Sequence, residues 1–157
     1  MSLESVRAHL AEIAPDLEIL ESPTSTATVT LAAEAFGVQP GEIAKTLSLR
    51  QGERVFLLVA RGDARLDNKK AREAFGGKVK MLDLAECEDI TGHPVGGVCP
   101  FGLARKLDIY CDIGLRDFDI VVPAAGSKTS AVKIAPQRLA EIVGAEWVNV
   151  CLIPAEE

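Results

Sequence analysis

Apolar and polar residues alternate along this chain with two different periods, and these periods predict its helices and strands. Val6, Leu10 and Ile13 recur at helical spacing, which predicts a helix over residues 2–13. Short runs rich in Val, Leu and Ile, bounded by turn residues, predict strands instead. Further helices are predicted near 30–36, from a cap at Asp67 or Asn68 to Gly76-Gly77, from Asp83 through Ile90, and from Pro136 to Val143. The predicted strands are 17–20, 45–50, 54–60, 108–112, 120–122, 131–134 and 147–153.

The connections between these segments indicate the fold class. Residues 51–53 read Gln-Gly-Glu and separate two predicted strands by a hairpin-length turn, which favours a β-hairpin. Helices and strands intermingle elsewhere, and 157 residues suffice for one domain with its own core. We therefore expect a single α/β domain of the mixed α+β kind over residues 1–157, with a central mixed β-sheet flanked by helices.

The composition narrows the possible classes of protein. The chain is 48% hydrophobic but only 4% aromatic, so Val, Leu, Ile and Ala must fill the core. No apolar run approaches the roughly 18 residues that a membrane span needs, and no signal peptide is recognisable at the start. The expectation is a soluble cytoplasmic protein without a membrane partner.

The charge is unevenly distributed. A net charge of −6 argues against a protein that binds DNA or RNA over its whole surface. Residues 61–80 nevertheless carry seven basic side chains, Lys69 and Lys70 among them, against three acidic ones. Such a local basic patch suits contact with the end of a nucleic acid. Taken alone, it fits a solvated helix face equally well.

The four cysteines do not form a metal-binding pattern. Cys87, Cys99, Cys111 and Cys151 lie far apart without a C-x-x-C pair, and the two histidines share no ligand spacing with them. We expect reduced thiols, no metal and no cofactor.

Residues 91–103 read TGHPVGGVCPFGL and contain four glycines and two prolines. Glycines allow a ligand to approach the backbone closely, and successive N–H groups of such a loop can form a concavity that binds an anion or a developing oxyanion. A plain connecting loop, whose glycines only make turns, explains the composition equally well.

A second notable stretch, residues 37–47, reads GVQPGEIAKTL and contains one lysine, Lys45, in apolar surroundings. Lys45 begins a predicted strand. A lysine there is either a side chain that snorkels at the sheet edge or a fixed cation for an anionic ligand. Spacing alone favours the snorkelling interpretation.

Five motifs together resemble those of the YbaK-like aminoacyl-tRNA deacylases, a superfamily that includes the editing domain inserted in bacterial prolyl-tRNA synthetase. The motifs occur in the same order and extend over nearly the whole chain. The resemblance implies a compact α/β domain that hydrolyses the ester between a wrong amino acid and its tRNA. The five motifs are GVQPGEIAKTL (37–47), VFLLVARGDARLDNKK (55–70), TGHPVGGVCPFGL (91–103), YCDIGL (110–115) and VVPAAG (121–126).

The resemblance also implies roles for individual residues. An aminoacyl ester is already activated, so its hydrolysis needs positioning and oxyanion stabilisation more than a strong nucleophile. Backbone N–H groups of Gly96, Gly97 and Val98 are expected to supply that stabilisation, and Lys45 and Thr46 to bind phosphate or ribose oxygens. A 2′- or 3′-hydroxyl of the substrate is expected to help activate water. The further substrate-binding positions are Thr28, Val29, Pro100, Phe101, Gly102, Asp112 and Gly126, while Lys69 and Lys70 are expected to contact RNA.

Two of these assignments have alternatives. Asp112 could equally cap the end of a strand, and Gly126 could equally make a turn. Cys99 and His93 together invite a Cys–His nucleophile hypothesis. The resemblance implies no covalent intermediate, so His93 is interpreted as a hydrogen-bonding residue of the loop.

The leading hypothesis is an enzyme that removes a small noncognate amino acid from mischarged tRNA, above all tRNA(Pro). A pocket formed by Thr28, Val29 and their neighbours favours alanine or 2-aminobutyrate, with cysteine, serine and threonine as alternatives. Prolyl-tRNA synthetase is a second expected partner, and DNA is not expected. The rival hypothesis is a non-catalytic module that binds a tRNA end or an aminoacyl-adenylate.

Overall fold

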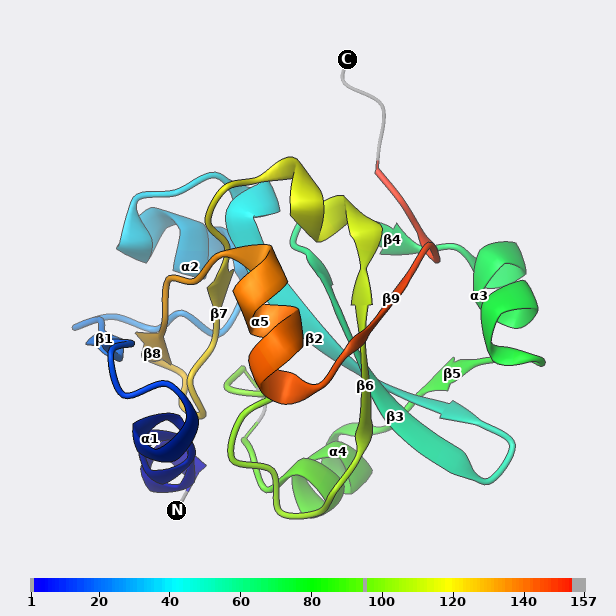
Figure 1. The fold of residues 1–157 in the computed structure, drawn as a ribbon, viewed down its shortest axis with the longest axis horizontal. Helices are drawn as coiled ribbons and strands as arrows, with labels where there is room; N and C mark the ends of the chain where they lie inside the picture. Colours follow the sequence, from blue (N-terminus) through cyan, green and yellow to red (C-terminus); the bar gives the residue numbers. More distant parts are fainter. Residues whose placement is uncertain (1, 95, 154–157) are drawn as a thin grey trace.

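The computed structural model describes residues 2–94 and 96–153, which form helices packed around a twisted sheet (Figure 1). Residue 95 of the predicted glycine loop lies outside the described residues. The helices are α1 (Ser2–Ile13), α2 (Val29–Phe36), α3 (Asn68–Phe75), α4 (Leu84–Thr91) and α5 (Pro136–Val143), with 3-10 turns η1 (Pro40–Glu42) and η2 (Ile113–Asp117). The strands are β1 (Leu20–Glu21), β2 (Ile43–Gln51), β3 (Arg54–Arg61), β4 (Arg65–Leu66), β5 (Lys80–Met81), β6 (Asp108–Asp112), β7 (Val122–Pro123), β8 (Ser130–Ala131), β9 (Glu146–Val148) and β10 (Cys151–Leu152).

The central sheet is mixed, as predicted. Its strand order is β5-β2-β3-β6-β9, and β7 also pairs with β2. β2 and β3 form the expected antiparallel hairpin, whereas β6 runs parallel to β3 and β9 parallel to β6. The fold class and the hairpin are thereby confirmed.

Helices cover both faces of this sheet. On one face, Leu57 and Val59 of β3 pack in the same cluster as Val6 of α1 and Leu139 of α5, all of them buried. On the other face, side chains of β2 and β3 pack against Ala71 and Phe75 of α3. Because successive side chains of a strand point to opposite faces, even-numbered residues of β2 face the first layer, whereas Leu47 and Leu49 face α3.

Polar side chains cap the start of three helices, including the cap predicted at Asp67. Thr28 caps α2 by accepting a hydrogen bond from the N–H of Leu31 at 3.2 Å, and Asp67 and Asp83 cap α3 and α4 in the same way. α2, α3, α4 and α5 each end at a glycine in the left-handed conformation, where a side chain would be strained.

The last predicted strand, 147–153, is wrong in its extent, because the chain forms two strands there. The Asp112 carboxylate accepts hydrogen bonds from the N–H groups of Val150 and Cys151, at 2.9 and 3.1 Å, where β9 ends and β10 begins. β10 then pairs with β4 instead of continuing along β6.

Other strand boundaries also differ from the predictions. The segment predicted at 17–20 forms a strand only at β1, and those predicted at 120–122 and 131–134 shrink to β7 and β8 with isolated bridges beside them. The two-residue strands β4 and β5 were not predicted, since they are too short to show a periodic pattern. None of the helices within 2–94 and 96–153 has the length and apolar character that crossing a bilayer requires.

Candidate active site

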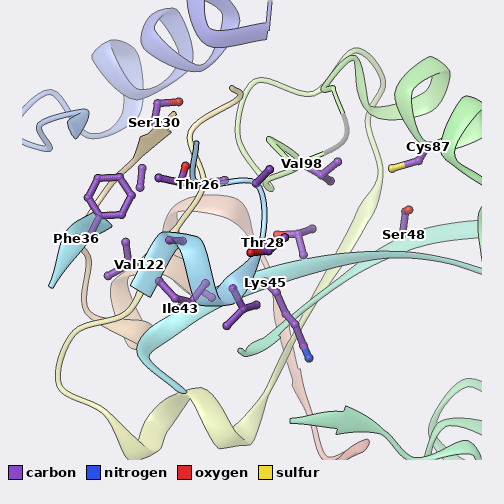
Figure 2. A pocket seen from close by; sticks show the side chains of 18 of the residues that line it. Thr26, Thr28, Phe36, Ile43, Lys45, Ser48, Cys87, Val98, Val122 and Ser130 are labelled. Atoms are coloured by element: carbon purple, nitrogen blue, oxygen red, sulfur yellow. The ribbon is translucent and has the colours of Figure 1, made fainter. Parts of the chain in front are cut away.

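A cavity of about 240 Å³ lies beside strand β2, on the side that faces α4 (Figure 2). Its walls come from the segment before α2, from α2, β2, β5, β7, β8 and α4, and from the glycine loop. Most side chains that line it are aliphatic or carry a hydroxyl group. The lining residues are Thr26, Ala27, Thr28, Val29, Ala32, Phe36, Ile43, Ala44, Lys45, Thr46, Ser48, Met81, Leu82, Leu84, Cys87, Gly96, Val98, Val122, Ala124, Ser130 and Ala131.

The outer edge of β2 is paired at both ends and open between them. β7 pairs with residues 43–44 and β5 with residues 49–50. The carbonyl of Ser48 accepts from the N–H of Leu82 at 3.0 Å, so even-numbered residues of β2 direct their backbone groups to this edge. The backbone N–H and C=O of Thr46 and the N–H of Ser48 therefore face the gap beside the cavity.

The side chain of Thr46 adds an unusual polar atom. Within the described part of the chain, its hydroxyl oxygen is the one buried side-chain oxygen or nitrogen without a hydrogen-bond partner. A buried hydroxyl without a partner costs about 1–3 kcal/mol. Such a group at the wall of a cavity is well placed to bind a polar atom of a ligand.

The loops that contain Thr26, Gly96 and Lys128 meet at another wall of the cavity and contact one another. Thr26 donates its N–H and its hydroxyl to the carbonyl of Lys128, at 2.6 and 2.9 Å. A side chain at Gly96 or Gly97 would press against Ala27 or against the backbone of Ser127, with closest approaches of 2.7 and 2.8 Å. The two glycines thus let the loop approach both neighbours closely, although only Gly96 has a positive φ, of 87°.

The N–H groups of this loop are not equivalent. Gly97 already donates its N–H to the carbonyl of Pro94 at 2.9 Å. For Gly96 and Val98 no backbone partner of the N–H is found among the described residues, and both residues line the cavity. Of the three predicted oxyanion donors, Gly96 and Val98 are therefore the better placed.

Lys45 lines the cavity with its stem but directs its ammonium group elsewhere. Figure 2 shows the side chain leaving β2 on the side away from Thr28 and Val98. Its Nζ donates to the carbonyl of Gly62 at 3.2 Å and also to that of Ala64. Burial lowers the pKa of this ammonium below its ordinary value. In this arrangement the ammonium group connects β2 by hydrogen bonds to the turn that follows β3.

The remaining predicted substrate positions lie apart from this cavity. Pro100 and Gly102 line a second cavity, of about 640 Å³, between α1, α5 and the segment 100–107. Phe101 is fully buried in the core, and Gly126 packs against the backbone of α1. Asp112 caps the end of β6, where its second carboxylate oxygen accepts from the N–H of Gly114 at 2.9 Å. Of the two interpretations of Asp112, the geometry matches the strand-end cap.

Cys99 and His93 do not form an accessible nucleophile pair. Both are fully buried, and the His93 Nε2 lies 2.7 Å from the carbonyl oxygen of Phe101 and 3.6 Å from the Cys99 sulfur. Burial raises the pKa of the Cys99 thiol to about 12, which removes the thiolate that a nucleophile needs. His93 is a hydrogen-bonding residue of the loop, as interpreted from the sequence.

Lys69 and Lys70 lie on α3, which packs on the sheet face opposite to the cavity. Lys69 is exposed, whereas the ammonium of Lys70 donates to Asn149 Oδ1 and to the carbonyl of Cys151, at 3.2 and 3.3 Å. Their contact with RNA stays a prediction.

Sequence reasoning missed several wall residues. Phe36 lies one helical turn after Ala32, and Ser48 lies two residues after Thr46. The periods of the helix and of the strand could therefore have identified both as residues of the cavity wall. Leu84 and Cys87 come from α4, and nothing in the sequence places that helix beside β2. The aromatic side chain of Phe36 was not expected in this pocket.

Comparison with known proteins adds independent information. Residues 23–142 match the model of a family described as the aminoacyl-tRNA editing domain. The chain is 47% identical over 153 residues to "Uncharacterized protein YwhH" of Bacillus subtilis, covering 96% of this chain and 98% of that protein. It is 29% identical over 121 residues to the "Putative Cys-tRNA(Pro)/Cys-tRNA(Cys) deacylase EbsC" of Enterococcus faecalis, covering 75% and 73% of the two chains. A crystal structure of "a putative trans-editing enzyme for prolyl tRNA synthetase" superposes with a TM-score of 0.88 at 30% identity, over 95% of this chain and 96% of that one.

Proposed function

Because this chain belongs to the aminoacyl-tRNA editing domain family, we propose that it is a deacylase that hydrolyses the ester between a small amino acid and the terminal ribose of a mischarged tRNA. The observation that carries the proposal is the open edge of β2. There, backbone groups of Thr46 and Ser48 face the gap beside a small cavity, and Thr46, whose buried hydroxyl has no partner, lines that cavity. These N–H, C=O and hydroxyl groups can form hydrogen bonds with the amino nitrogen, the carbonyl oxygen and the ribose oxygens of an aminoacyl ester.

The chemistry assigned to this site is water addition with oxyanion stabilisation. Water adds to the ester carbonyl, the ribose oxygen leaves with a proton, and a free amino acid and tRNA result. The N–H groups of Gly96 and Val98 are assigned to the developing oxyanion, where preorganised donors lower the barrier. Among the described residues that line the cavity there is no histidine or carboxylate. A hydroxyl of the substrate ribose is therefore proposed to help activate the water.

The size and walls of the cavity support a small amino acid. At about 240 Å³ it lies below the roughly 300–1,000 Å³ typical of sites for drug-sized ligands. Val29, Val98 and Val122 supply aliphatic contacts, and Phe36 closes the side formed by α2. We infer a preference for alanine or 2-aminobutyrate, carried by tRNA(Pro).

Cysteine is the second candidate, and a specific observation favours it. The relative EbsC carries Cys-tRNA(Pro) and Cys-tRNA(Cys) in its name. The CH2–SH side chain of cysteine is close in size to the ethyl group of 2-aminobutyrate, so an aliphatic pocket discriminates poorly between them.

Thr46→Val is the variant that tests the function. It keeps the shape of the side chain and removes only the hydroxyl, so kcat/KM is expected to fall by about 5- to 150-fold, the equivalent of about 1–3 kcal/mol. Since the hydroxyl has no protein partner to lose, the free energy of unfolding should stay equal or rise. Thr30→Val, on the exposed side of α2, is the matched control and should change neither quantity.

The substrate is decided by a panel of tRNA(Pro) charged with alanine, 2-aminobutyrate, cysteine, serine, threonine or proline. Hydrolysis of one of the small esters, weakened in Thr46→Val, supports the proposal. If cysteine leads by more than about tenfold, the aliphatic preference is wrong while deacylation stands. If the protein binds the charged tRNA but hydrolyses none of the panel, it is a binding module instead.

A further inference from the structure

The first helix, α1, contacts both ends of the glycine loop (residues 91–103). At the start of the loop, the hydroxyl of Ser2 contacts Nδ1 of His93. At its end, the N–H of Gly102 donates a hydrogen bond to Nδ1 of His9 at 2.9 Å. The N–H groups proposed to bind the oxyanion lie between these two contacts. A helix outside the cavity is therefore bonded to the loop on both sides of those donors.

Gly102 lies directly against the backbone of α1. A side chain at this position would approach the backbone of Ser5 to 2.6 Å, and the φ of Gly102 is 56°, a conformation that favours glycine. The Gly102 carbonyl accepts from the Ser5 hydroxyl at 3.0 Å. Since His9 accepts from the N–H, both main-chain groups of Gly102 are bonded to side chains of α1. The end of the loop is thus fixed to the helix through one residue.

The contact through His9 depends on the protonation of its ring. An N–H group donates only to a ring nitrogen without a proton, so Nδ1 is unprotonated and Nε2 carries the one proton of the neutral ring. Histidine rings take up a second proton between about pH 5 and 8. The ring then has a donor at both nitrogens, and Nδ1 no longer accepts from the N–H of Gly102. Acidification should therefore release the end of the loop.

Other titratable groups lie near this contact. His9 and Glu12 of α1 both line the second cavity. Arg105 and Lys106 line it from the segment that follows the loop, and the side chains that α5 contributes are apolar. The other histidine of the chain, His93, is buried, and burial lowers the pKa of its ring below the ordinary value. His93 therefore takes up its proton at a lower pH than an exposed histidine does.

We propose that His9 is a positioning residue for deacylation, whose neutral ring holds the end of the glycine loop and thereby the N–H groups of Gly96 and Val98. This inference rests on the proposed function, because those two N–H groups are assigned to the oxyanion there. Preorganised donors lower the barrier only while they stay directed at the developing charge. A loop released at Gly102 leaves the rest of the cavity wall in place but holds these donors less firmly. The loss should therefore appear in kcat and not in KM.

The variants His9→Leu and His9→Asn separate the hydrogen-bond acceptor from the titrating ring. Leucine accepts no hydrogen bond, whereas asparagine supplies an oxygen acceptor and does not titrate. The substrate is the ester of the tRNA(Pro) panel that reacts fastest. At pH 8, kcat should fall about tenfold in His9→Leu, equivalent to about 1.4 kcal/mol, and stay within about twofold of the wild type in His9→Asn. Glu12→Gln, at an exposed position of α1, is the control and should keep the wild-type kcat.

The pH dependence is the readout that a merely structural role would not move. The kcat of His9→Asn divided by that of the wild type should be near one at pH 8 and rise about threefold or more by pH 5.5, because only the wild-type ring gains a proton. Both proteins keep His93, so the effect of that histidine cancels in the ratio. A ratio that stays constant from pH 8 to pH 5.5 would overturn the inference, and so would equal losses of kcat in the two variants. If His9→Leu does not fold, the ratio for His9→Asn decides alone.

A measurement without substrate keeps this inference distinct from the proposed function. Gly97 donates its N–H to the carbonyl of Pro94 within the loop, at 2.9 Å. Hydrogen exchange of the Gly97 amide, followed by NMR, should be about tenfold faster in His9→Leu than in the wild type and unchanged in His9→Asn. If the wild type hydrolyses no ester of the panel, the proposed function fails, and this exchange still judges the role of His9. Faster exchange in His9→Leu alone supports the positioning of the loop, and equal exchange in all three proteins refutes it.

Discussion

The sequence predicts that Lys45 binds the substrate, whereas the structure predicts that it stabilises the fold. The substitution Lys45→Met distinguishes these two roles. Methionine keeps most of the stem that lines the cavity and removes only the ammonium group. A role in binding the substrate predicts lost activity with unchanged stability. The hydrogen bonds to the carbonyls of Gly62 and Ala64 predict lost stability instead.

The magnitude follows from those two bonds. A hydrogen bond that involves a charged group contributes about 1.5–3 kcal/mol. The carbonyl that loses its donor at Ala64 belongs to a residue that is 1% exposed. Because Lys45 itself is only half-buried, and removing it also relieves the cost of burying a charge, we expect a net loss of about 2 kcal/mol. For a domain of this size that lowers Tm by roughly 4–8 °C.

The assay is urea unfolding of the wild type, Lys45→Met and the control Lys69→Met, together with deacylation rates at equal protein concentration. Lys69 is exposed, so its replacement should change stability by less than about 0.5 kcal/mol. A loss near 2 kcal/mol in Lys45→Met, with a moderate fall in kcat at constant KM, supports a positioning role through β2. If Lys45→Met is as stable as Lys69→Met yet inactive, the ammonium acts on the substrate, and the reasoning from the hydrogen bonds is wrong.

Two further predictions concern the loop and the buried thiols. Gly97→Ala should lower kcat/KM at least tenfold with the fold retained by circular dichroism, because the added methyl group would lie 2.8 Å from the backbone of Ser127 and push the loop out of place; full activity would show that the loop tolerates the shift. The pKa of the Cys99 thiol is raised from 9.0 to about 12, so above pH 9 the unfolded chain loses a proton that the folded chain keeps, and stability should fall as pH rises from 9 toward 12. Urea titrations from pH 8 to 10.5 should show a shallower decline in Cys99→Ala than in the wild type, and identical slopes would contradict the assignment.

Much of the fold could be predicted from local patterns. The hairpin of β2 and β3 follows from two apolar runs around a Gly-containing turn, and the caps at Thr28, Asp67 and Asp83 follow from side chains that satisfy free N–H groups. The division of the last strand into β9 and β10 could not be predicted, because it depends on hydrogen bonds that Val150 and Cys151 donate to the carboxylate of Asp112, 38 residues before Val150 in the chain.

The candidate site was predictable in part. The sequence pointed to Thr28, Val29, Thr46, Gly96 and Val98, which the structure places around one cavity. Lys45 and Thr46 were expected to share one ligand, but adjacent residues of a strand point to opposite faces, and the period of two already indicates this conflict.

Other parts of the site depend on tertiary packing. Leu84 and Met81 reach the cavity only because α4 and β5 pack beside β2, and no local pattern gives that arrangement. Pro100, Phe101 and Gly102 stand near the loop glycines in sequence, yet the chain turns away from the cavity after Val98.

The open edge of β2 has a consequence for how such a protein can diverge. Main-chain atoms of residues 46 and 48 are among the polar groups beside the cavity, and every amino acid except proline supplies the same N–H and C=O. Nearly all missense changes at these positions therefore preserve the main-chain groups proposed to hold the ester, although a change at Thr46 also removes its hydroxyl. The apolar half, formed by side chains of α2, β7 and α4, changes with each substitution. Substitutions can therefore change the selectivity for the amino acid over evolutionary time, while the main-chain contacts to the ester bond stay the same.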